Sequence, residues 1–475
     1  MKGPFYLAVD QGGHATRALV FGEDGRVVAR ALVPVGGRSD GAVAEQDAEA
    51  VVASVRQAIS WALDSDPRIT DGIVAAGLAT QRSSLVCWDT RTGAALAPVI
   101  GWQDRRAAAL TARYQDHAFA VRERTGLVLS PHYGALKMRW CLEHLPAVQA
   151  AARGGYLAMG PLASFLAYRL IEPRRLLADP ANASRTLLWS RHTHGWDPEL
   201  LALFGISEDV LPVCAPSRYP FGALVTRELS VPLAILTGDQ SAALFSEGAP
   251  RTDTVYLNMG TGAFLQRPIG HVPADGEALL WSTALLDGHE RVYVAEGTVH
   301  GAGAALDWAA AHLGFPQIAQ RCAQLLADPA ARPLFVNAIG GLGSPYWRTD
   351  IESRFEGDGS VEGKAAAVLE SVVFLVAENL LAIRTASGPF ATILATGGLT
   401  GCDTLCQSLA DLAQTPVRRP ADPEGTARGL AYLVAGGPRA WPGGKGQSFL
   451  ARPDEGAAAR FAAWRALMPV PATRG

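Results

Sequence analysis

The sequence has a small share of charged residues and no segment dense in one sign of charge. Asp, Glu, Lys and Arg make up 18 % of 475 residues, against a usual share of about 25 %. Hydrophobic residues make up 49 %, which excludes wholesale disorder and is enough for two large domains. The formal net charge is −3 and no block of Lys and Arg occurs, so we expect no nucleic-acid partner.

Cysteines are few and long apolar runs are missing. Of the six cysteines only Cys402 and Cys406 are close, and their spacing without nearby His is a poor zinc signature. We expect reduced thiols and a cytoplasmic location. The longest purely apolar run, residues 372–377, is far short of the roughly 20 residues of a membrane-crossing helix. The apolar start before Asp10 is too short for a signal peptide and is typical of a strand, so we expect no membrane partner.

Glycine, in contrast, is abundant, with 50 residues, which favours tight turns and a backbone that approaches phosphates closely. The chain opens with strands at residues 5–10 and 16–21 around a glycine turn, followed by a third at 26–33. A similar strand, glycine turn and strand recur at residues 254–267. Two copies predict a duplicated architecture with a site between the halves, although hairpins are common enough for coincidence to stay open.

Between and after the two copies, strand and helix patterns alternate. The pattern breaks at residues 245–252, where we expect the boundary between two lobes. Apolar runs predict strands at residues 73–80, 85–89, 233–237, 291–296 and 392–396, and helical periodicity predicts helices at residues 47–63, 110–125, 162–170, 363–383, 402–413 and 455–468.

Three glycine turns follow strands. Asp10 precedes Gly12 and Gly13, and a carboxylate at a strand end beside such a turn could hold Mg²⁺ next to a phosphate. The second turn is Gly260-Thr261-Gly262, and the third is Gly397-Gly398, which precedes a helix. A purely structural hairpin is the alternative for each turn. The glycine spacings fit neither the P-loop nor the dinucleotide-binding pattern.

A fourth feature is the carboxylate of Asp239, which stands at the end of a strand and before a helix. That place suits a catalytic base, and it equally suits an N-cap that accepts hydrogen bonds from helix amides.

The order of the motifs along the chain resembles the FGGY family of carbohydrate kinases, and most closely its glycerol kinase branch. The resemblance runs from about residue 5 to the closing helix. It is carried by Asp10-Gln11-Gly12, Gln81-Arg82, Trp102-Gln103-Asp104-Arg105-Arg106, Asn182-Ala183-Ser184-Arg185-Thr186, Gly238-Asp239-Gln240, Gly260-Thr261-Gly262, residues 340–347 and Gly397-Gly398.

This resemblance implies an α/β fold of two actin-like (ribonuclease H-like) lobes, with the active site in the cleft between them. Residues 1–247 would form the acceptor and Mg²⁺/phosphate side, and residues 248–475 the nucleotide side. It implies an ATP-dependent kinase that needs Mg²⁺ and phosphorylates a small polyol or sugar, and it is compatible with a homodimer.

The resemblance also assigns roles to residues. Asp239 would be the general base and, with Asp10, would organise Mg²⁺. The remaining residues implied are Gly12, Gly13, His14, Arg17, Gly260 and Thr261 along the phosphates, Gly303, Asp307, Gly397, Gly398 and Cys402 near the nucleoside, and Arg82, Ser83, Trp102, His132, Gln240 and Phe264 around the acceptor.

The sequence departs from glycerol kinases in the phosphate loop and near the nucleoside. Two loop threonines of that branch are replaced by Gly13 and His14, and His14 would either meet the γ-phosphate or point outward. Asp307 and Cys402 stand where glycerol kinases have Gln and Asn, which would weaken contacts to adenosine. For Asp307 a local cap or ion pair is the alternative.

The acceptor pocket departs as well. Ser83 replaces a Glu that accepts hydrogen bonds from glycerol, and His132 replaces a Tyr. With one strong acceptor fewer and more room, the pocket should favour a longer polyol or a ketose over glycerol. Two alternatives stay open: a catalytically impaired member that acts as a ligand-binding or regulatory protein, and a conformational ATPase.

Overall fold

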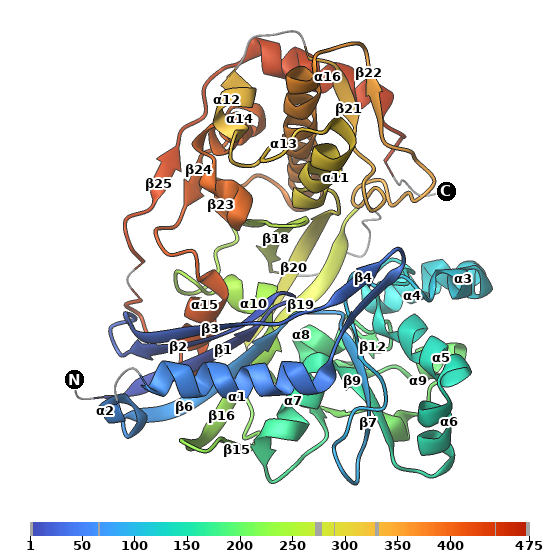
Figure 1. Cartoon of the computed structure of the whole chain (residues 1–475), viewed down its shortest axis with the longest axis vertical. Coiled ribbons are helices and arrows are strands. Elements are labelled where there is room, and N and C mark those ends of the chain that lie inside the picture. Colours follow the sequence, from blue (N-terminus) through green and yellow to red (C-terminus); the bar gives the residue numbers. More distant parts are fainter. Residues whose placement is uncertain are drawn as a thin grey trace. The chain divides into compact units, whose positions relative to one another are not determined.

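Two seven-stranded sheets organise the described residues of a computed structural model, whose chain divides into two units (Figure 1). It describes residues 3–64, 67–270, 278–288, 290–327, 332–441 and 443–471. Unit 1 is Met1–Ala249, Ser282–Tyr293 and Glu424–Pro442; unit 2 is Pro250–Trp281, Val294–Pro423 and Gly443–Gly475. The two later segments of unit 1 lie within residues 248–475, for which the family resemblance implies the second lobe.

The sheet of unit 1 mixes parallel and antiparallel strands. β1 pairs antiparallel with β2 and parallel with β6, and β16 adds to β6 in parallel. Its order is β10 (Ile171–Glu172), β15 (Ala223–Val225), β16 (Ser230–Gly238), β6 (Ile73–Thr80), β1 (Phe5–Gln11), β2 (Ala15–Gly22) and β3 (Val27–Pro34).

The second seven-stranded sheet repeats this pairing in its unit 2 strands. β17 pairs antiparallel with β18 and parallel with β23, and β24 adds to β23 in parallel. The repeat confirms the predicted duplication. The order is β19 (Leu280–Asp287), β20 (Glu290–Val299), β18 (Ala263–Ile269), β17 (Thr254–Met259), β23 (Thr392–Thr396), β24 (Val417–Arg419) and β25 (Gln447–Phe449).

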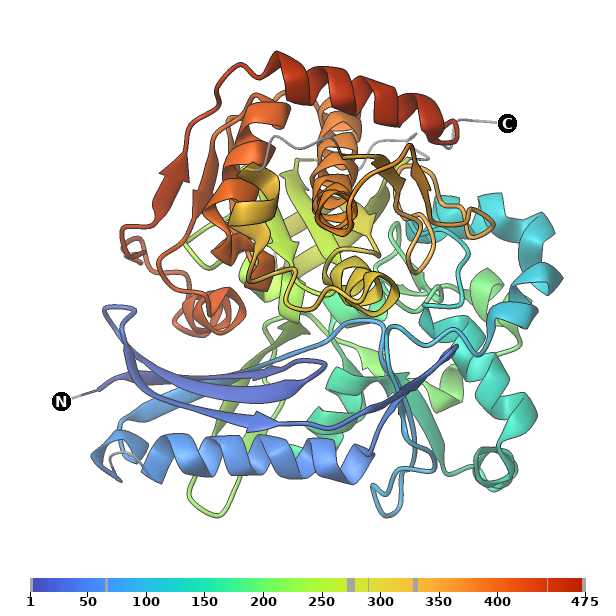
Figure 2. The same ribbon diagram turned by 45° about the horizontal axis from the view of Figure 1, so that its top comes forward.

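Helices cover both faces of the central strands of unit 1. α1 (Ala48–Asp64) lies along β2 and β3, and it buries Val51, Val55 and Ile59 at helical spacing (Figure 2). α15 (Gly425–Val434) packs against β1 and β6 from the other face. α7 (Leu162–Leu170) packs against β6, and the short α10 (Asp239–Ala243) packs against α15.

A second, smaller sheet of unit 1 carries the loops around the predicted acceptor residues. β7 pairs with both β8 and β9, and α5 (Gly134–His144) packs against β7 and β9. The order is β4 (Arg38–Asp40), β5 (Val43–Gln46), β8 (Val99–Ile100), β7 (Leu85–Asp89) and β9 (Leu157–Pro161). Further helices are α2 (Pro67–Thr70), α6 (Pro146–Arg153), α8 (Pro180–Ala183) and α9 (Pro198–Phe204).

α13 (Val361–Ser387) is the core helix of unit 2. It is long and apolar enough to cross a membrane, but 89 % of its most apolar window is buried inside the protein. Packing explains the burial, because α11 (Gly303–Leu313), α12 (Cys322–Ala327) and α14 (Asp403–Ala413) all contact α13. α16 (Glu455–Leu467) is the predicted closing helix, and Figure 2 shows it running over the end of α13. Trp464 of α16 is fully buried against Phe374.

One predicted helix is wrong in its continuity. Residues 110–125 form three pieces: α3 (Ala108–Thr111), a 3₁₀ turn (Ala112–His117) and α4 (Ala118–Thr125). The 3₁₀ turn buries none of its residues, so tertiary packing gives it no reason to continue as an α-helix.

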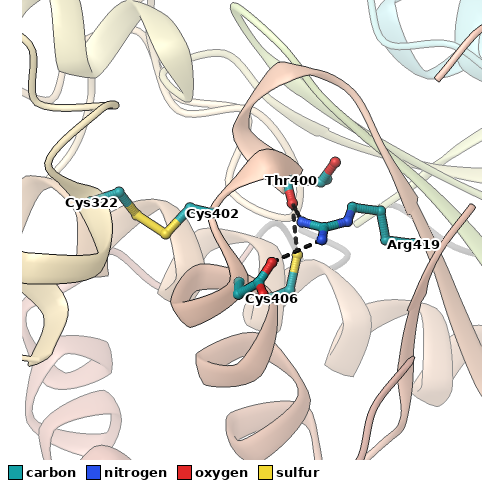
Figure 3. The surroundings of a disulfide bond; sticks show 6 residues. Cys322, Thr400, Cys402, Cys406 and Arg419 are labelled. Carbon is teal, nitrogen blue, oxygen red and sulfur yellow. Dashed lines mark hydrogen bonds and ion pairs between the residues drawn. A yellow bond between two sulfur atoms is a disulfide. The ribbon is translucent and has the colours of Figure 1, made fainter. Parts of the chain in front are cut away.

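The expectation that all six cysteines are reduced is also wrong. Cys322, at the start of α12, forms a disulfide with Cys402, which immediately precedes α14 (Figure 3). Their Cα atoms are 6.3 Å apart, and 80 residues separate them in sequence. Such a pairing cannot be deduced from one sequence. Cys87, Cys141, Cys214 and Cys406 are free.

Reduction of this disulfide is expected to destabilise unit 2. Cross-linking two residues 80 positions apart removes chain entropy from the unfolded state, about 4 kcal/mol in the loop-entropy model. That loss corresponds to a melting temperature lower by roughly 10 °C. Thermal unfolding with and without a phosphine reductant measures it.

The control is the double variant Cys322→Ser/Cys402→Ser, whose melting temperature should be low and should not change when the reductant is added. Thiol titration of the denatured protein should find four free thiols before reduction and six after it. Six thiols before reduction, or an unchanged melting temperature, would contradict the cross-link.

Candidate active site

The first glycine turn joins β1 to β2 at the carboxyl end of β1. The Gly12 amide donates to the Ala15 carbonyl at 3.0 Å, which closes the turn. The His14 side chain is exposed, while its carbonyl accepts from the amide of Val35 at 2.8 Å. The backbone therefore fixes this turn without help from the His14 imidazole.

Three buried glutamines hold the same turn. The Gln81 side-chain amide donates to Gln11 Oε1 at 3.3 Å and to Gln46 Oε1 at 2.7 Å. Gln46 in turn donates to the Gly13 carbonyl at 2.9 Å. The role of Gln46 was not predicted from the sequence. The only indication there is an uncharged polar residue just before an expected helix, and that alone carries little information.

Asp10 and Asp239 lie at one edge of the sheet of unit 1. Asp10 in β1 and Thr237 in β16 are both in register with Ala79 of β6, and Asp239 follows two residues after Thr237. Asp10 is buried, and burial together with the negative charge of Asp239 raises its pKa to about 7. The positive charge of Arg17, which lies opposite Asp10 in β2, lowers the Asp10 pKa and so opposes this shift. The Nε of Arg17 lies 3.2 Å from Glu424 Oε2.

This pair of carboxylates is a donor set suited to a hard divalent cation. A cation held by these carboxylates would relieve the repulsion that helps to raise the Asp10 pKa. Within the described residues no group of three or more His, Cys, Asp or Glu side chains could hold a metal alone. Mg²⁺ commonly takes one or two carboxylates and completes its shell with water and phosphate oxygens, so the residues present fit it.

Several residues predicted to line the acceptor pocket lie at the same edge. A Cβ on Gly238 would come within 2.6 Å of Arg82 Cγ, so the Arg82 side chain lies directly over the residue before Asp239. Arg82 donates to Gln240 Oε1. On the other side, a Cβ on Gly13 would lie 3.9 Å from the Trp102 indole nitrogen.

Two predicted acceptor residues have distinctive surroundings. Ser83 follows Arg82 with φ of +63°, a left-handed conformation that is uncommon for a residue other than glycine. His132 precedes α5, and its Nδ1 lies 2.9 Å from Ser130 Oγ. The Asn182–Thr186 motif seats α5, because the Ala135 amide donates to the Thr186 carbonyl at 2.6 Å.

Unit 2 gathers its own glycine residues at the end of β17. The Gly303 amide donates to the Gly260 carbonyl at 2.9 Å, and the next amide donates to the Thr261 carbonyl at 3.0 Å. A Cβ on Gly303 would stand 2.7 Å from the Gly260 oxygen, so no larger residue fits there. Gly397 has φ of +94°, and its Cβ would be 2.5 Å from the Met259 oxygen.

The other predicted residues of unit 2 lie around these turns. Gly398 begins the 3₁₀ turn after Gly397, and Cys402 follows that turn and is held in the disulfide. Asp307 is exposed on α11, four residues after Gly303. Phe264 lies in β18, and a Cβ on Gly262 would be 3.3 Å from its ring.

A duplicated α/β fold, with paired carboxylates and glycine turns at its strand ends, is the framework of an ATP-dependent phosphotransferase. The chain belongs to the FGGY family of carbohydrate kinases. The model of the family's N-terminal domain matches residues 5–246, and that of its C-terminal domain matches residues 255–436.

Similar proteins and solved structures support this family assignment. The chain is 38 % identical to a glycerol kinase of Methylobacterium nodulans over 90 % of its own length and 88 % of the relative's. It is 37 % identical to a glycerol kinase of Trichlorobacter lovleyi, with 90 % and 89 % covered.

Among solved structures, the ADP-bound glycerol kinase of Plasmodium falciparum matches with a TM-score of 0.83 at 20 % identity, covering 98 % of this chain and 97 % of the other. A xylulose kinase of Brucella ovis gives 0.84 at 22 % identity, with 98 % of each chain covered. These structures establish the fold.

Proposed function

We propose that this kinase transfers the γ-phosphoryl group of ATP to a hydroxyl of a polyol or ketose longer than glycerol. The observation that carries the proposal is Ser83, which stands in the acceptor region directly after Arg82. A glycerol kinase has a carboxylate there, and that carboxylate accepts hydrogen bonds from the small triol. A hydroxymethyl group accepts them more weakly and leaves more room.

In the proposed reaction Asp239 accepts the proton of the attacking hydroxyl. The acceptor oxygen forms a bond to the γ-phosphorus, the bond from that phosphorus to the bridging oxygen breaks, and ADP leaves. Mg²⁺, held by Asp10 and Asp239, would neutralise charge on the phosphates. The amides of Gly12 and Gly260 close their own turns, with the carbonyls of Ala15 and Gly262 as acceptors. The amides of Gly13 and Thr261 and the guanidinium of Arg17 would contact the phosphate oxygens.

The residues near the nucleoside complete the proposal. Gly303, Gly397 and Gly398 would let the adenosine approach the backbone closely. The curated relatives named above are glycerol kinases, so glycerol is the acceptor against which the proposal is tested. The cytoplasmic location and a homodimer stay predictions.

A panel of acceptors tests the proposed function. ADP release with Mg·ATP is measured for glycerol, tetritols, pentitols, pentuloses and hexuloses. We expect kcat/KM for at least one four- to six-carbon acceptor to exceed that for glycerol by about tenfold or more, the value of one lost hydrogen bond to a charged group.

The variant Ser83→Glu is the matched counterpart, and it should shift the preference toward glycerol. If glycerol is the best acceptor of the unchanged protein, the proposal of a longer acceptor is refuted, while the kinase activity itself still holds. Silence with every acceptor, with ATP bound, would instead favour the ligand-binding alternative.

A further inference from the structure

We propose that Lys137 is a positioning residue that holds the two acceptor-binding segments of unit 1 in register, an inference that rests on the proposed function for its effect on catalysis. Lys137 lies on α5 and is fully buried. Within the described part of the chain no other lysine is buried. A buried ammonium group is costly unless it makes several hydrogen bonds, so its partners are informative.

The Lys137 ammonium bonds to two backbone carbonyls from different segments. Nζ donates to the Ser83 carbonyl at 2.9 Å and to the Gly101 carbonyl at 2.7 Å. The first follows β6 and the second follows β8. β7 and β8 pair at Leu85 and Ile100, so both carbonyls lie at the same end of that pair.

Each carbonyl adjoins a residue predicted to bind the acceptor. The first belongs to Ser83 itself, and the second precedes Trp102. The φ of +63° at Ser83 is unfavourable for a serine, so it needs an interaction that holds it. The Lys137 ammonium supplies one, and it ties this residue to the Trp102 segment at the same time.

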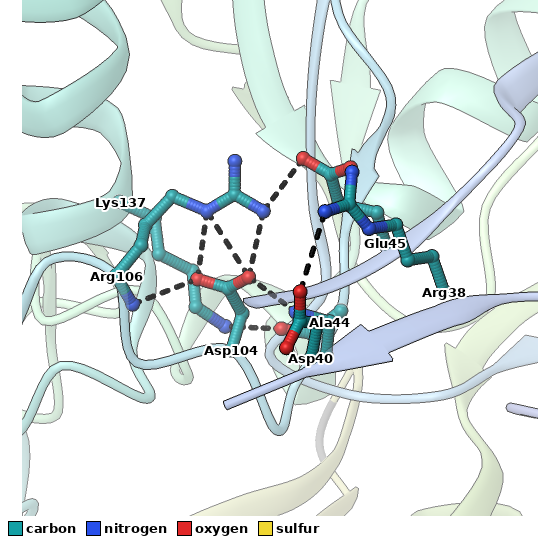
Figure 4. A network of polar contacts seen from close by, with 8 residues as sticks. Arg38, Asp40, Ala44, Glu45, Asp104, Arg106 and Lys137 are labelled. Atoms are coloured by element: carbon teal, nitrogen blue, oxygen red, sulfur yellow. Dashed lines mark hydrogen bonds and ion pairs between the residues drawn. The ribbon is translucent and has the colours of Figure 1, made fainter. Parts of the chain in front are cut away.

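Charged neighbours fix the Trp102 segment without competing for Lys137. Asp104 accepts from the Ala44 amide at 2.7 Å and from Arg106, whose Nη2 also lies 2.7 Å from Glu45 (Figure 4). The Arg106 guanidinium lies 5.0 Å from the Trp140 ring of α5. Since Asp104 is satisfied by these donors, the ammonium of Lys137 is left to the two carbonyls.

The charge state of Lys137 fits this role. Burial lowers its pKa to about 7, Arg106 acts in the same direction, and Asp104 and Cys141 oppose the shift. The charged form makes the stronger hydrogen bonds to carbonyls, and the neutral amine still has two N–H donors for them. The connection between the segments therefore persists on both sides of neutral pH.

The test is the variant Lys137→Met, which keeps an unbranched chain and loses the donors. We expect the KM of the acceptor to rise about tenfold or more, with the KM of ATP within about twofold of the original. Lys137→Gln, with one amide that serves a single carbonyl at a time, should give a smaller rise. The control is Lys364→Met on α13, which should change neither KM.

Hydrogen exchange provides a readout that needs no substrate. In Lys137→Met, amides of residues 82–85 and 100–105 should exchange at least about tenfold faster, because their carbonyl anchor is gone. If exchange is faster in Lys137→Met but the unchanged protein phosphorylates no acceptor, the proposed function is overturned, while the role of Lys137 in joining the two segments still holds. An unchanged acceptor KM in an active protein, or a general loss affecting both substrates equally, would overturn the positioning role. If Lys137→Met does not fold, Lys137→Gln carries the same two measurements.

Discussion

Replacement of Asp239 by asparagine is expected to lower kcat by about 10²- to 10⁴-fold, the usual contribution of a general base. The amide keeps the shape of the carboxylate and cannot accept the proton of the attacking hydroxyl. Acceptor-dependent ADP release measures the loss. The KM of ATP should change less, because the glycine turns proposed to bind nucleotide do not depend on this side chain and Asp10 remains as the other proposed Mg²⁺ ligand.

The surroundings of Asp239 make asparagine a conservative test. The backbone amide of Gln240 donates to Asp239 Oδ1 at 2.7 Å, and the side-chain oxygen of an asparagine can accept the same bond. Thr426 Oγ1 donates to the Asp239 backbone carbonyl at 3.3 Å, which the substitution leaves in place. The start of α10 should therefore keep its conformation. A lost kcat then reports the proposed roles of the carboxylate, as base and as Mg²⁺ ligand, and not a local rearrangement.

The matched control is Asp24→Asn, at the exposed hairpin turn between β2 and β3. It removes a carboxylate of the same unit, and its partner Arg26 is an exposed residue at 3.5 Å. Its kcat should match the original. Acceptor-dependent turnover of Asp239→Asn within about tenfold of the original would show that Asp239 is not the base and would favour its N-terminal helix position as its whole role.

The parts of this fold that the sequence predicts are those that repeat a short pattern. β6 and α7 have the predicted bounds, because an apolar run and a helical period each end at a clear boundary. The duplication was visible because both glycine turns lie between paired strands. The sequence patterns place Asp10 and Asp239 each at the end of a strand, and only the family resemblance implies that they act together. The structure adds the reason for their common edge, since parallel strands bring their carboxyl ends together.

What the sequence did not reveal depends on contacts between distant segments. The Cys322–Cys402 disulfide and the Lys137 bonds join residues whose separation in sequence carries no signal. The break of residues 110–125 into short pieces reflects a missing apolar partner, which only the tertiary structure reveals. The return of residues 424–442 to unit 1 has the same cause, because α15 gains its partners from strands near the start of the chain.

Because α15 belongs to unit 1 and packs against α10, a residue of α15 also determines the position of Asp239. α15 and α10 approach each other so closely that a Cβ on Gly429 would lie 1.9 Å from the Ala242 carbonyl oxygen. The nearest backbone atoms cannot yield without moving α10, which begins with Asp239. Gly429 is therefore required for the position of the proposed base, although it lies far from it in sequence.

Gly429→Ala should consequently reduce both stability and activity. An alanine normally favours a helix by about 1 kcal/mol over glycine, but here the overlap outweighs this gain and should cost about 1–3 kcal/mol. The displacement of α10 should lower kcat by up to about 10²-fold, the effect of a misplacement near 1 Å. Gly425→Ala, on the same helix, is the control, because its Cβ would meet only Ser246 at 3.8 Å. Thermal unfolding and kcat are measured for both variants; equal values would show that α10 adapts to the extra methyl group and that Asp239 does not depend on this contact.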